Sequence, residues 1–320
     1  MYIFWAVGEK MILIILLYAI FSAMTFINSA LMDSNPYPLM VGMIRALGSG
    51  IIILGYMLIF RRAALLSIRL SRQQWRWLIA YAVLIHAVAM CAFSFSVLYA
   101  NPVTVCFMFA MAPFITALIQ YLHGQERLTP QKFCGLVVGV IGLVPILIQS
   151  SYVGHASPLK SAALGNWITF GAMILFCYGW VLFKKLLQSC HYSIQMLNGI
   201  AMMIGGLLSV VMVLAVHGAS LGSLSYSSDF GWLMAAFLAS SLITYSLYAY
   251  LLQHFSPTFI SFAGFLEPAF GMIYGFFLVG YQISGIDLAS FFVLFLGLYI
   301  FYLDELNKKR GRKGDIESFL

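Results

Sequence analysis

The stretch IQMLNGIAMMIGGLLSVVMVLAVH, at residues 194–217, decides the kind of fold that this chain adopts. Its first 23 residues carry no charged side chain. A helix needs about 20 predominantly apolar residues to cross the hydrocarbon core of a bilayer. This stretch is therefore predicted to be a transmembrane helix, and it sets the pattern for the rest of the chain.

Further stretches along the 320 residues have the same character and are separated by short polar breaks, several of which contain a helix-breaking proline. They lie at 10–32, 38–60, 76–98, 102–122, 132–150, 164–184, 230–253, 258–280 and 284–303. Of all residues, 62% are hydrophobic and 8% are charged. A soluble domain carries about 25% charged residues. We predict an all-α integral membrane protein of ten transmembrane helices, the first of which is retained rather than cleaved as a signal peptide.

The basic residues predict the orientation of the chain. With a cytoplasmic N-terminus and ten crossings, fifteen basic residues fall in cytoplasmic segments and one, Lys160, in an external loop. The fifteen are Lys10, Arg61, Arg62, Arg69, Arg72, Arg76, Arg127, Lys132, Lys184, Lys185, Lys308, Lys309, Arg310, Arg312 and Lys313. Cytoplasmic loops are enriched in Lys and Arg, so both termini are predicted to be cytoplasmic, at a bacterial inner membrane. The net charge of +7 therefore reports orientation in a lipid bilayer, not nucleic-acid binding.

A weak internal repeat divides the chain into two halves. A shift of 155 residues aligns Trp77-Leu78 with Trp232-Leu233, Pro102 with Pro257, Pro113 with Pro268, and Gly142 with Gly297. Five helices per half is an odd number, so the second half starts from the opposite face of the membrane. Such inverted repeats are typical of transporters, whose substrate site lies near the bilayer midplane. The expected division is 1–150, 151–305 and a basic cytoplasmic tail at 306–320.

Four stretches, in order along the chain, carry a likeness to a known family. They are Pro38-Leu39-Met40-Val41-Gly42-Met43-Ile44-Arg45; Ala112-Pro113-Phe114 with Gly124-Gln125-Glu126-Arg127-Leu128-Thr129, Gly135 and Gly142; Gly179-Trp180-Val181-Leu182-Phe183-Lys184-Lys185; and Leu266-Glu267-Pro268 with Gly297. The ordered set resembles the drug/metabolite transporter superfamily, in particular its EamA-type members. Tyr18-Ala19-Ile20-Phe21 and Gly280-Tyr281 depart from the family pattern, which bears on subfamily and substrate. The resemblance implies ten helices in two inverted halves and alternating access around a central cavity.

Ionisable side chains inside predicted helices are the first candidates for transport, because they are costly in a membrane. Glu267 could bind a cationic group, carry a proton, or satisfy a neighbouring helix. Arg45 could bind a carboxylate or phosphate, reach outward to water, or pair with Asp33, and an architectural or gating role is preferred. His86 could carry a proton or contact substrate, and a hydrogen-bonded core role is preferred.

Aromatic and hydroxyl side chains form a second group of candidates. They are Tyr18, Tyr178, Trp180, Ser241, Tyr245 and Tyr248. The last three share one face of the eighth helix. Together the group would line an amphipathic cavity suited to aromatic or cationic substrates. Lipid contact or interfacial anchoring is the alternative.

Other residues are predicted to shape and join the helices. Asn28 and Asn198 would either join helices or touch substrate. Pro113 and Pro268 are predicted helix breaks that act as hinges. Small-residue pairs, Gly135 with Gly139 and Gly271 with Gly275, allow close helix packing, within one chain or between two chains of a dimer.

Motifs that are missing from the sequence narrow the function. It has no P-loop, no HExxH and no G-x-S-x-G, so neither ATP-driven transport nor an enzyme is expected. The five cysteines form no CxxC pair, and no metal or cofactor is predicted.

We predict a secondary transporter or facilitator of a small polar or amphipathic metabolite, with an amino acid or related compound as first choice. The protein would be a monomer or homodimer, with the proton as a candidate coupling ion. The alternatives are a membrane-embedded enzyme acting on lipid-linked groups and a membrane partner protein without transport activity.

Overall fold

The computed structural model describes residues 2–34, 37–63, 67–124, 129–152, 159–218 and 227–317. Within these ranges the regular structure is helical and no strand occurs, as the sequence predicts. The helices are α1 Tyr2–Ser34, α2 Pro38–Phe60, α4 Arg72–Tyr81, η1 Ala82–Ala89, α5 Met90–Ser96, α6 Pro102–Phe109, α7 Ala112–Leu122, α8 Pro130–Tyr152, α9 Leu159–Ser189, α10 Ile194–His217, α11 Phe230–His254, α12 Pro257–Ala263, α13 Leu266–Val279 and α14 Gly285–Glu317. In the described part of the chain, nine helical stretches are long and apolar enough to cross a membrane, and a further one, Gly285–Phe301, is shorter.

Helix ends differ from the predicted ones where polar groups, rather than hydropathy, determine them. The helix predicted from residue 76 begins at Arg72, because Ser71 and Gln74 form a capping box with reciprocal side-chain and backbone hydrogen bonds. At the other end of the chain, α14 continues through the predicted tail as far as Glu317. Residues 125–128, which include Arg127, and the side chains of Lys160 and of residues 308–313 lie outside the described residues.

Two helices that were predicted as continuous are each divided into two. The stretch at 102–122 is α6 followed by α7, and the stretch at 258–280 is α12 followed by α13. Pro113 stands in the first turn of α7 and Pro268 in that of α13. At each break the backbone makes i→i+3 bonds, from Ala110 N–H to Phe107 O and from Gly264 N–H to Ser261 O. A proline ring clashes with the carbonyl four residues earlier, which explains why both breaks precede a proline.

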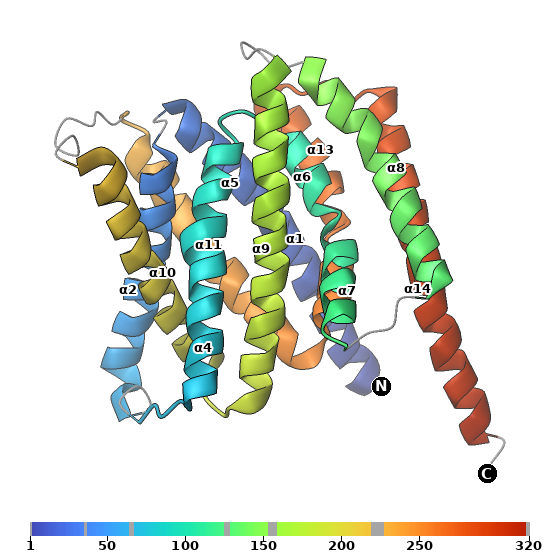
Figure 1. Ribbon diagram of the computed structural model, residues 1–320, viewed down its shortest axis with the longest axis horizontal. Helices are drawn as coiled ribbons and strands as arrows, with labels where there is room; N and C mark the ends of the chain where they lie inside the picture. The colour runs from blue at the N-terminus through green and yellow to red at the C-terminus, as the bar shows by residue number, and fades with distance from the viewer. Residues whose placement is uncertain are drawn as a thin grey trace.

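The helices pack as two pseudo-equivalent halves. The second helices of the two halves, α2 and α10, lie side by side at one edge, and the fifth helices, α8 and α14, lie side by side at the opposite edge (Figure 1). The first helix of each half contacts the third and fourth helices of the other, since α1 packs on α11 and α13, and α9 packs on α4, α5 and α7. The two divided helices also pack along one another, α6 on α13 and α7 on α12.

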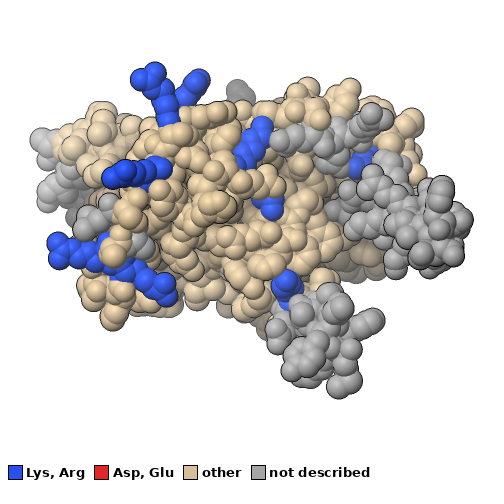
Figure 2. All heavy atoms as spheres, turned by 90° about the horizontal axis from the view of Figure 1, so that it is seen from below, with Lys and Arg blue, Asp and Glu red and all other residues tan. Residues whose placement is uncertain are grey.

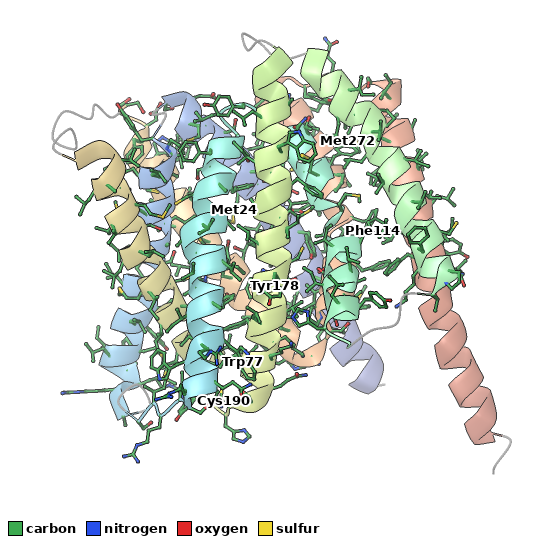
Figure 3. All side chains as sticks on the ribbon, in the orientation of Figure 1. Met24, Trp77, Phe114, Tyr178, Cys190 and Met272 are labelled. Carbon is green, nitrogen blue, oxygen red and sulfur yellow. The ribbon has the colours of Figure 1, made fainter. Side chains whose placement is uncertain are left out.

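The predicted small-residue pairs serve this packing within one chain. A Cβ added at Gly135 would lie 2.5 Å from the Gly297 carbonyl oxygen, and one at Gly271 would lie 2.7 Å from Cβ of Cys106. Near the contact of Gly135 with Gly297, Phe114 of α7 lies next to α8 (Figure 3). Each pair therefore joins the first half of the chain to the second.

One end of the bundle is basic. Both ends of the chain lie at the lower end of the bundle in Figure 1. Figure 2 views this end and shows Lys and Arg side chains spread across it. The basic residues at helix ends include Arg61 after α2, Arg72 at the start of α4, and Lys184 and Lys185 near the end of α9.

Candidate functional site

A cavity lies between the two halves, at the level of the divided helices. It encloses about 730 Å³ of non-atom space, including space open to the exterior. Its walls come from α1, α2, η1, α5, α6, α7, α9, α11, α12 and α13. The second, third, eighth and ninth predicted helices therefore line it, and the first, fourth and sixth line it as well.

Four phenylalanines form one wall of the cavity, packed edge to face. Phe176 meets Phe21 with ring centroids 6.0 Å apart and Phe109 at 6.1 Å, and Phe109 meets Phe93 at 5.9 Å. All four rings are half-buried and line the cavity. Aromatic faces attract cations, and their edges and faces also pack against planar apolar groups.

A second aromatic cluster surrounds Trp180. Its indole stacks on Tyr248 with centroids 4.1 Å apart, and Tyr245 lies nearly parallel to it at 5.8 Å. The indole Nε1 is buried and has no hydrogen-bond partner among the described residues. Tyr18 completes this side and donates from its hydroxyl to the Ile260 carbonyl at 2.6 Å.

Glu267 is the acidic residue of the cavity lining. It is 6% exposed and lies in the first turn of α13, where the helix dipole favours a negative charge. Ser22 donates to its backbone carbonyl at 3.0 Å, but among the described residues none donates to its carboxylate. The carboxylate is therefore held at the cavity with its acceptors available.

Arg45 is the basic residue of the lining, and its partners are hydroxyl groups. Its Nε donates to Ser241 Oγ at 2.9 Å and its Nη2 donates to Tyr245 OH at 3.0 Å. Of the alternatives for Arg45, pairing with Asp33 does not occur in this conformation, because α2 turns Arg45 toward α11 while Asp33 is exposed at the end of α1. Arg45 is also 3% exposed, so it does not reach outward to water.

The structure brings together part of the predicted set. Tyr18, Arg45, Trp180, Tyr245, Tyr248 and Glu267 line the cavity. Ser241 stands behind Arg45, and Pro113 and Pro268 flank the breaks beside the cavity.

Other predicted residues lie outside the cavity lining. Tyr178, in the middle of α9 (Figure 3), faces His123, with ring centroids 5.5 Å apart. Tyr178 is two residues from both Phe176 and Trp180, and side chains two residues apart point to different sides of a helix. Asn28 accepts a hydrogen bond from Ser94, and Asn198 accepts one from Tyr81. These two asparagines join helices in this conformation.

Sequence reasoning missed the phenylalanine wall, although the internal repeat contains a signal for it. The 155-residue shift pairs Phe21 with Phe176, and these two rings meet edge to face in the wall. The same shift pairs Phe93 with Tyr248, both of which line the cavity. Examining aromatic residues that recur at equivalent positions would have found three of the four rings of the wall; Phe109 is paired with Gly264 and would have been missed.

His86 lies behind Tyr245, in an unusual part of the third helix. It is fully buried on the π-helical segment η1, with its ring 5.3 Å from that of Tyr245 and 5.1 Å from that of Tyr81. Neither ring nitrogen has a hydrogen-bond partner among the described residues, and the nearby Asn198 amide is outside hydrogen-bond geometry. Buried polar atoms without partners are rare, and π-helical segments are frequent at functional sites.

We therefore expect His86→Phe to preserve the fold and to slow transport. A phenyl ring keeps the packing against the two tyrosines and removes only nitrogens that have no partner in this conformation. Membrane abundance and thermal stability should match those of the wild type. The turnover rate in vesicles should fall about 10-fold, because the variant loses one hydrogen bond of about 1.4 kcal/mol that His86 forms in another conformation of the transport cycle. Equal turnover in the two proteins would show that the ring serves packing alone.

Comparison with known proteins identifies the family. Residues 9–148 and 163–303 each match the model of the EamA-like transporter family. The chain belongs to this family. This membership confirms the predicted resemblance to the drug/metabolite transporters. It also confirms the predictions that the chain is a multi-pass membrane protein and that it is a transporter rather than an enzyme.

Named relatives of this EamA-like transporter are known in bacteria. The S-adenosylmethionine/S-adenosylhomocysteine transporter of Chlamydia trachomatis serovar L2 is 29% identical over 215 residues, covering 64% of this chain and 63% of the relative. The transporter of the same name from Chlamydia muridarum is 27% identical over 296 residues, 90% of each chain. Protein PecM of Dickeya dadantii is 23% identical over 282 residues, 88% of each chain.

A solved structure supports the fold. A protein crystal structure superposes with a TM-score of 0.64 at 13% identity, covering 92% of this chain and 96% of that one. The relatives' names support a metabolite transporter. The substrates in those names differ from the amino acid that the sequence suggested as first choice.

Proposed function

We propose that this EamA-like transporter exchanges S-adenosylmethionine and S-adenosylhomocysteine, or a close adenosyl amino acid, across the bacterial inner membrane. The relatives' names motivate the substrate, and the chemistry of the cavity supports it. S-adenosylmethionine combines a flat base, a cationic sulfonium and an amino acid. The cavity combines an aromatic wall, the Glu267 carboxylate and the Arg45 guanidinium. That combination of an acidic and a basic side chain on aromatic walls is the observation that carries the proposal.

The mechanism that we propose is alternating access. The chain would cross the membrane ten times, as inverted halves at 1–150 and 151–305 with a cytoplasmic segment at 306–320. The basic end of the bundle, which carries both chain ends, would face the cytoplasm. The two halves would rock about the breaks at 110–111 and 264–265, where the divided helices meet the cavity. One chain surrounds the cavity, so the working unit would be a single chain.

Exchange and protons are the proposed sources of energy. In a one-for-one exchange, the gradient of one compound could drive the movement of the other. Because S-adenosylhomocysteine lacks the sulfonium charge, each cycle would also move one net positive charge across the membrane. Glu267, whose carboxylate has no donor among the described residues, is the group through which a proton would take part.

Counterflow in proteoliposomes tests the proposal. Vesicles loaded with unlabelled S-adenosylmethionine or S-adenosylhomocysteine should accumulate external labelled S-adenosylmethionine transiently, and empty vesicles should not. Methionine and adenosine, each of which supplies one part of the substrate, should compete weakly. The same vesicles should be screened with amino acids, nucleotides and organic cations. Counterflow with one of those classes, in folded protein that fails with both adenosyl compounds, would contradict the proposal.

A further inference from the structure

Arg45 holds a permanent positive charge at the cavity, and among the described residues no carboxylate contacts its guanidinium. Among the cavity-lining residues, it is the cationic one. An arginine has five N–H donors, and the described residues supply two acceptors, the hydroxyls of Ser241 and Tyr245. Both acceptors are neutral, whereas a charge inside a transmembrane helix is normally paired. An anionic group of a ligand would satisfy the remaining donors and balance the charge.

The guanidinium is held in a fixed direction. The Ser241 hydroxyl donates to the Phe237 carbonyl at 2.7 Å, which leaves its oxygen to accept from Arg45. The guanidinium carbon also lies 4.5 Å from the centroid of the Phe237 ring and 5.4 Å from that of Tyr245. Two hydrogen bonds and two rings thus orient the group before any ligand arrives, which lowers the entropy lost on binding.

We infer that Arg45, with Ser241 and Tyr245, forms a subsite that binds the carboxylate of an amino-acid-type substrate. This inference rests on the proposed function and assigns one end of the substrate. The planar guanidinium matches a carboxylate, and one carboxylate balances its single charge. A phosphate would bring excess negative charge into a cavity that already contains Glu267. Because Arg45 belongs to α2 and its two partners belong to α11, the subsite lies where the two halves meet.

The decisive probe is decarboxylated S-adenosylmethionine, which keeps the base, the sulfonium and the amine. In wild-type proteoliposomes it should compete with labelled S-adenosylmethionine about 10-fold to 100-fold less well than unlabelled S-adenosylmethionine, the range for hydrogen bonds to a charged group. Arg45→Gln should bind the two compounds about equally. Arg45→Lys, which keeps the charge but loses the planar fork, should show an intermediate ratio.

Milder variants keep the test valid if Arg45→Gln fails to fold. Ser241→Ala and Tyr245→Phe each remove one hydroxyl that orients Arg45, and each should reduce the ratio several-fold. Ser240→Ala is the matched control, because the Ser240 hydroxyl donates to the Phe237 carbonyl and does not contact Arg45. Its ratio should equal that of the wild type.

The outcomes separate this inference from the proposed function. Equal competition by the two compounds in wild-type vesicles that transport S-adenosylmethionine would overturn the carboxylate subsite and leave the transport proposal standing. Adenosine monophosphate that competes better than the decarboxylated compound, and loses this advantage in Arg45→Gln, would assign the subsite to phosphate instead. A ratio that falls in Ser241→Ala and Tyr245→Phe but not in Ser240→Ala would establish the subsite.

Discussion

Glu267→Gln is expected to reduce the affinity for S-adenosylmethionine by about 10-fold or more, since two opposite unit charges about 4 Å apart attract by about 1–4 kcal/mol. The substitution keeps the size of the side chain and removes the one group of the cavity lining that can carry a negative charge opposite a bound sulfonium. S-adenosylhomocysteine, which has a neutral thioether in place of the sulfonium, should lose much less. The measurement is competition by each compound in proteoliposomes, wild type against variant.

Asp33→Asn is the control for this variant. Asp33 is a carboxylate of the same helical bundle, but it is exposed at the end of α1 and does not line the cavity. Its substitution should leave both affinities unchanged. An equal loss for both substrates in Glu267→Gln would mean that the carboxylate positions a helix and does not recognise the sulfonium.

The same variant tests whether Glu267 carries a proton. If it does, uptake by the wild type depends on the pH gradient, and glutamine, which cannot exchange a proton, removes that dependence. Uptake should be measured with and without an imposed gradient in both proteins. Identical pH profiles in the two would exclude Glu267 from proton coupling.

The membrane-spanning stretches could be predicted from the sequence because crossing a bilayer sets a strict requirement on length and hydropathy. The stretch at 194–217 coincides with α10, and 38–60 coincides with α2. The division of two other stretches could not be read in the same way. Hydropathy is unaffected by the turns at Ala110 and Gly264, and Pro113 and Pro268 indicate only where a break is permitted.

The site was predictable only in part, because residue type does not fix the direction of a side chain. Trp180 and Tyr178 are both aromatic and close on α9, yet only Trp180 reaches the cavity. The rotation of a helix is set by its packing against neighbours. The partner of Arg45 depends in the same way on contacts between α2 and α11, which charge alone does not reveal.

Gly135→Leu is expected to prevent the chain from folding, because two backbones meet at this position. A Cβ there would lie 2.5 Å from the Gly297 oxygen and 2.6 Å from the Phe301 nitrogen. Overpacking that side chains can absorb costs about 1–3 kcal/mol. Here the obstacles are backbone atoms of α14, so α8 and α14 must move apart, and the last helices of the two halves lose their contact.

Gly171→Leu is the matched control, since Gly171 is exposed on α9 and a Cβ there meets nothing within 4 Å. Size-exclusion chromatography in detergent should give a monodisperse peak for Gly171→Leu and mostly aggregate for Gly135→Leu. A monodisperse Gly135→Leu protein with the wild-type melting temperature would show that α8 and α14 do not touch in solution. The contact between α8 and α14 also joins the two halves at one edge of the bundle, as the contact between α2 and α10 does at the opposite edge. Gly135→Ala is expected to fold with α8 and α14 slightly separated. This variant should still bind substrate in competition assays but should lose transport turnover, because rocking of the two halves requires that α8 and α14 stay in contact.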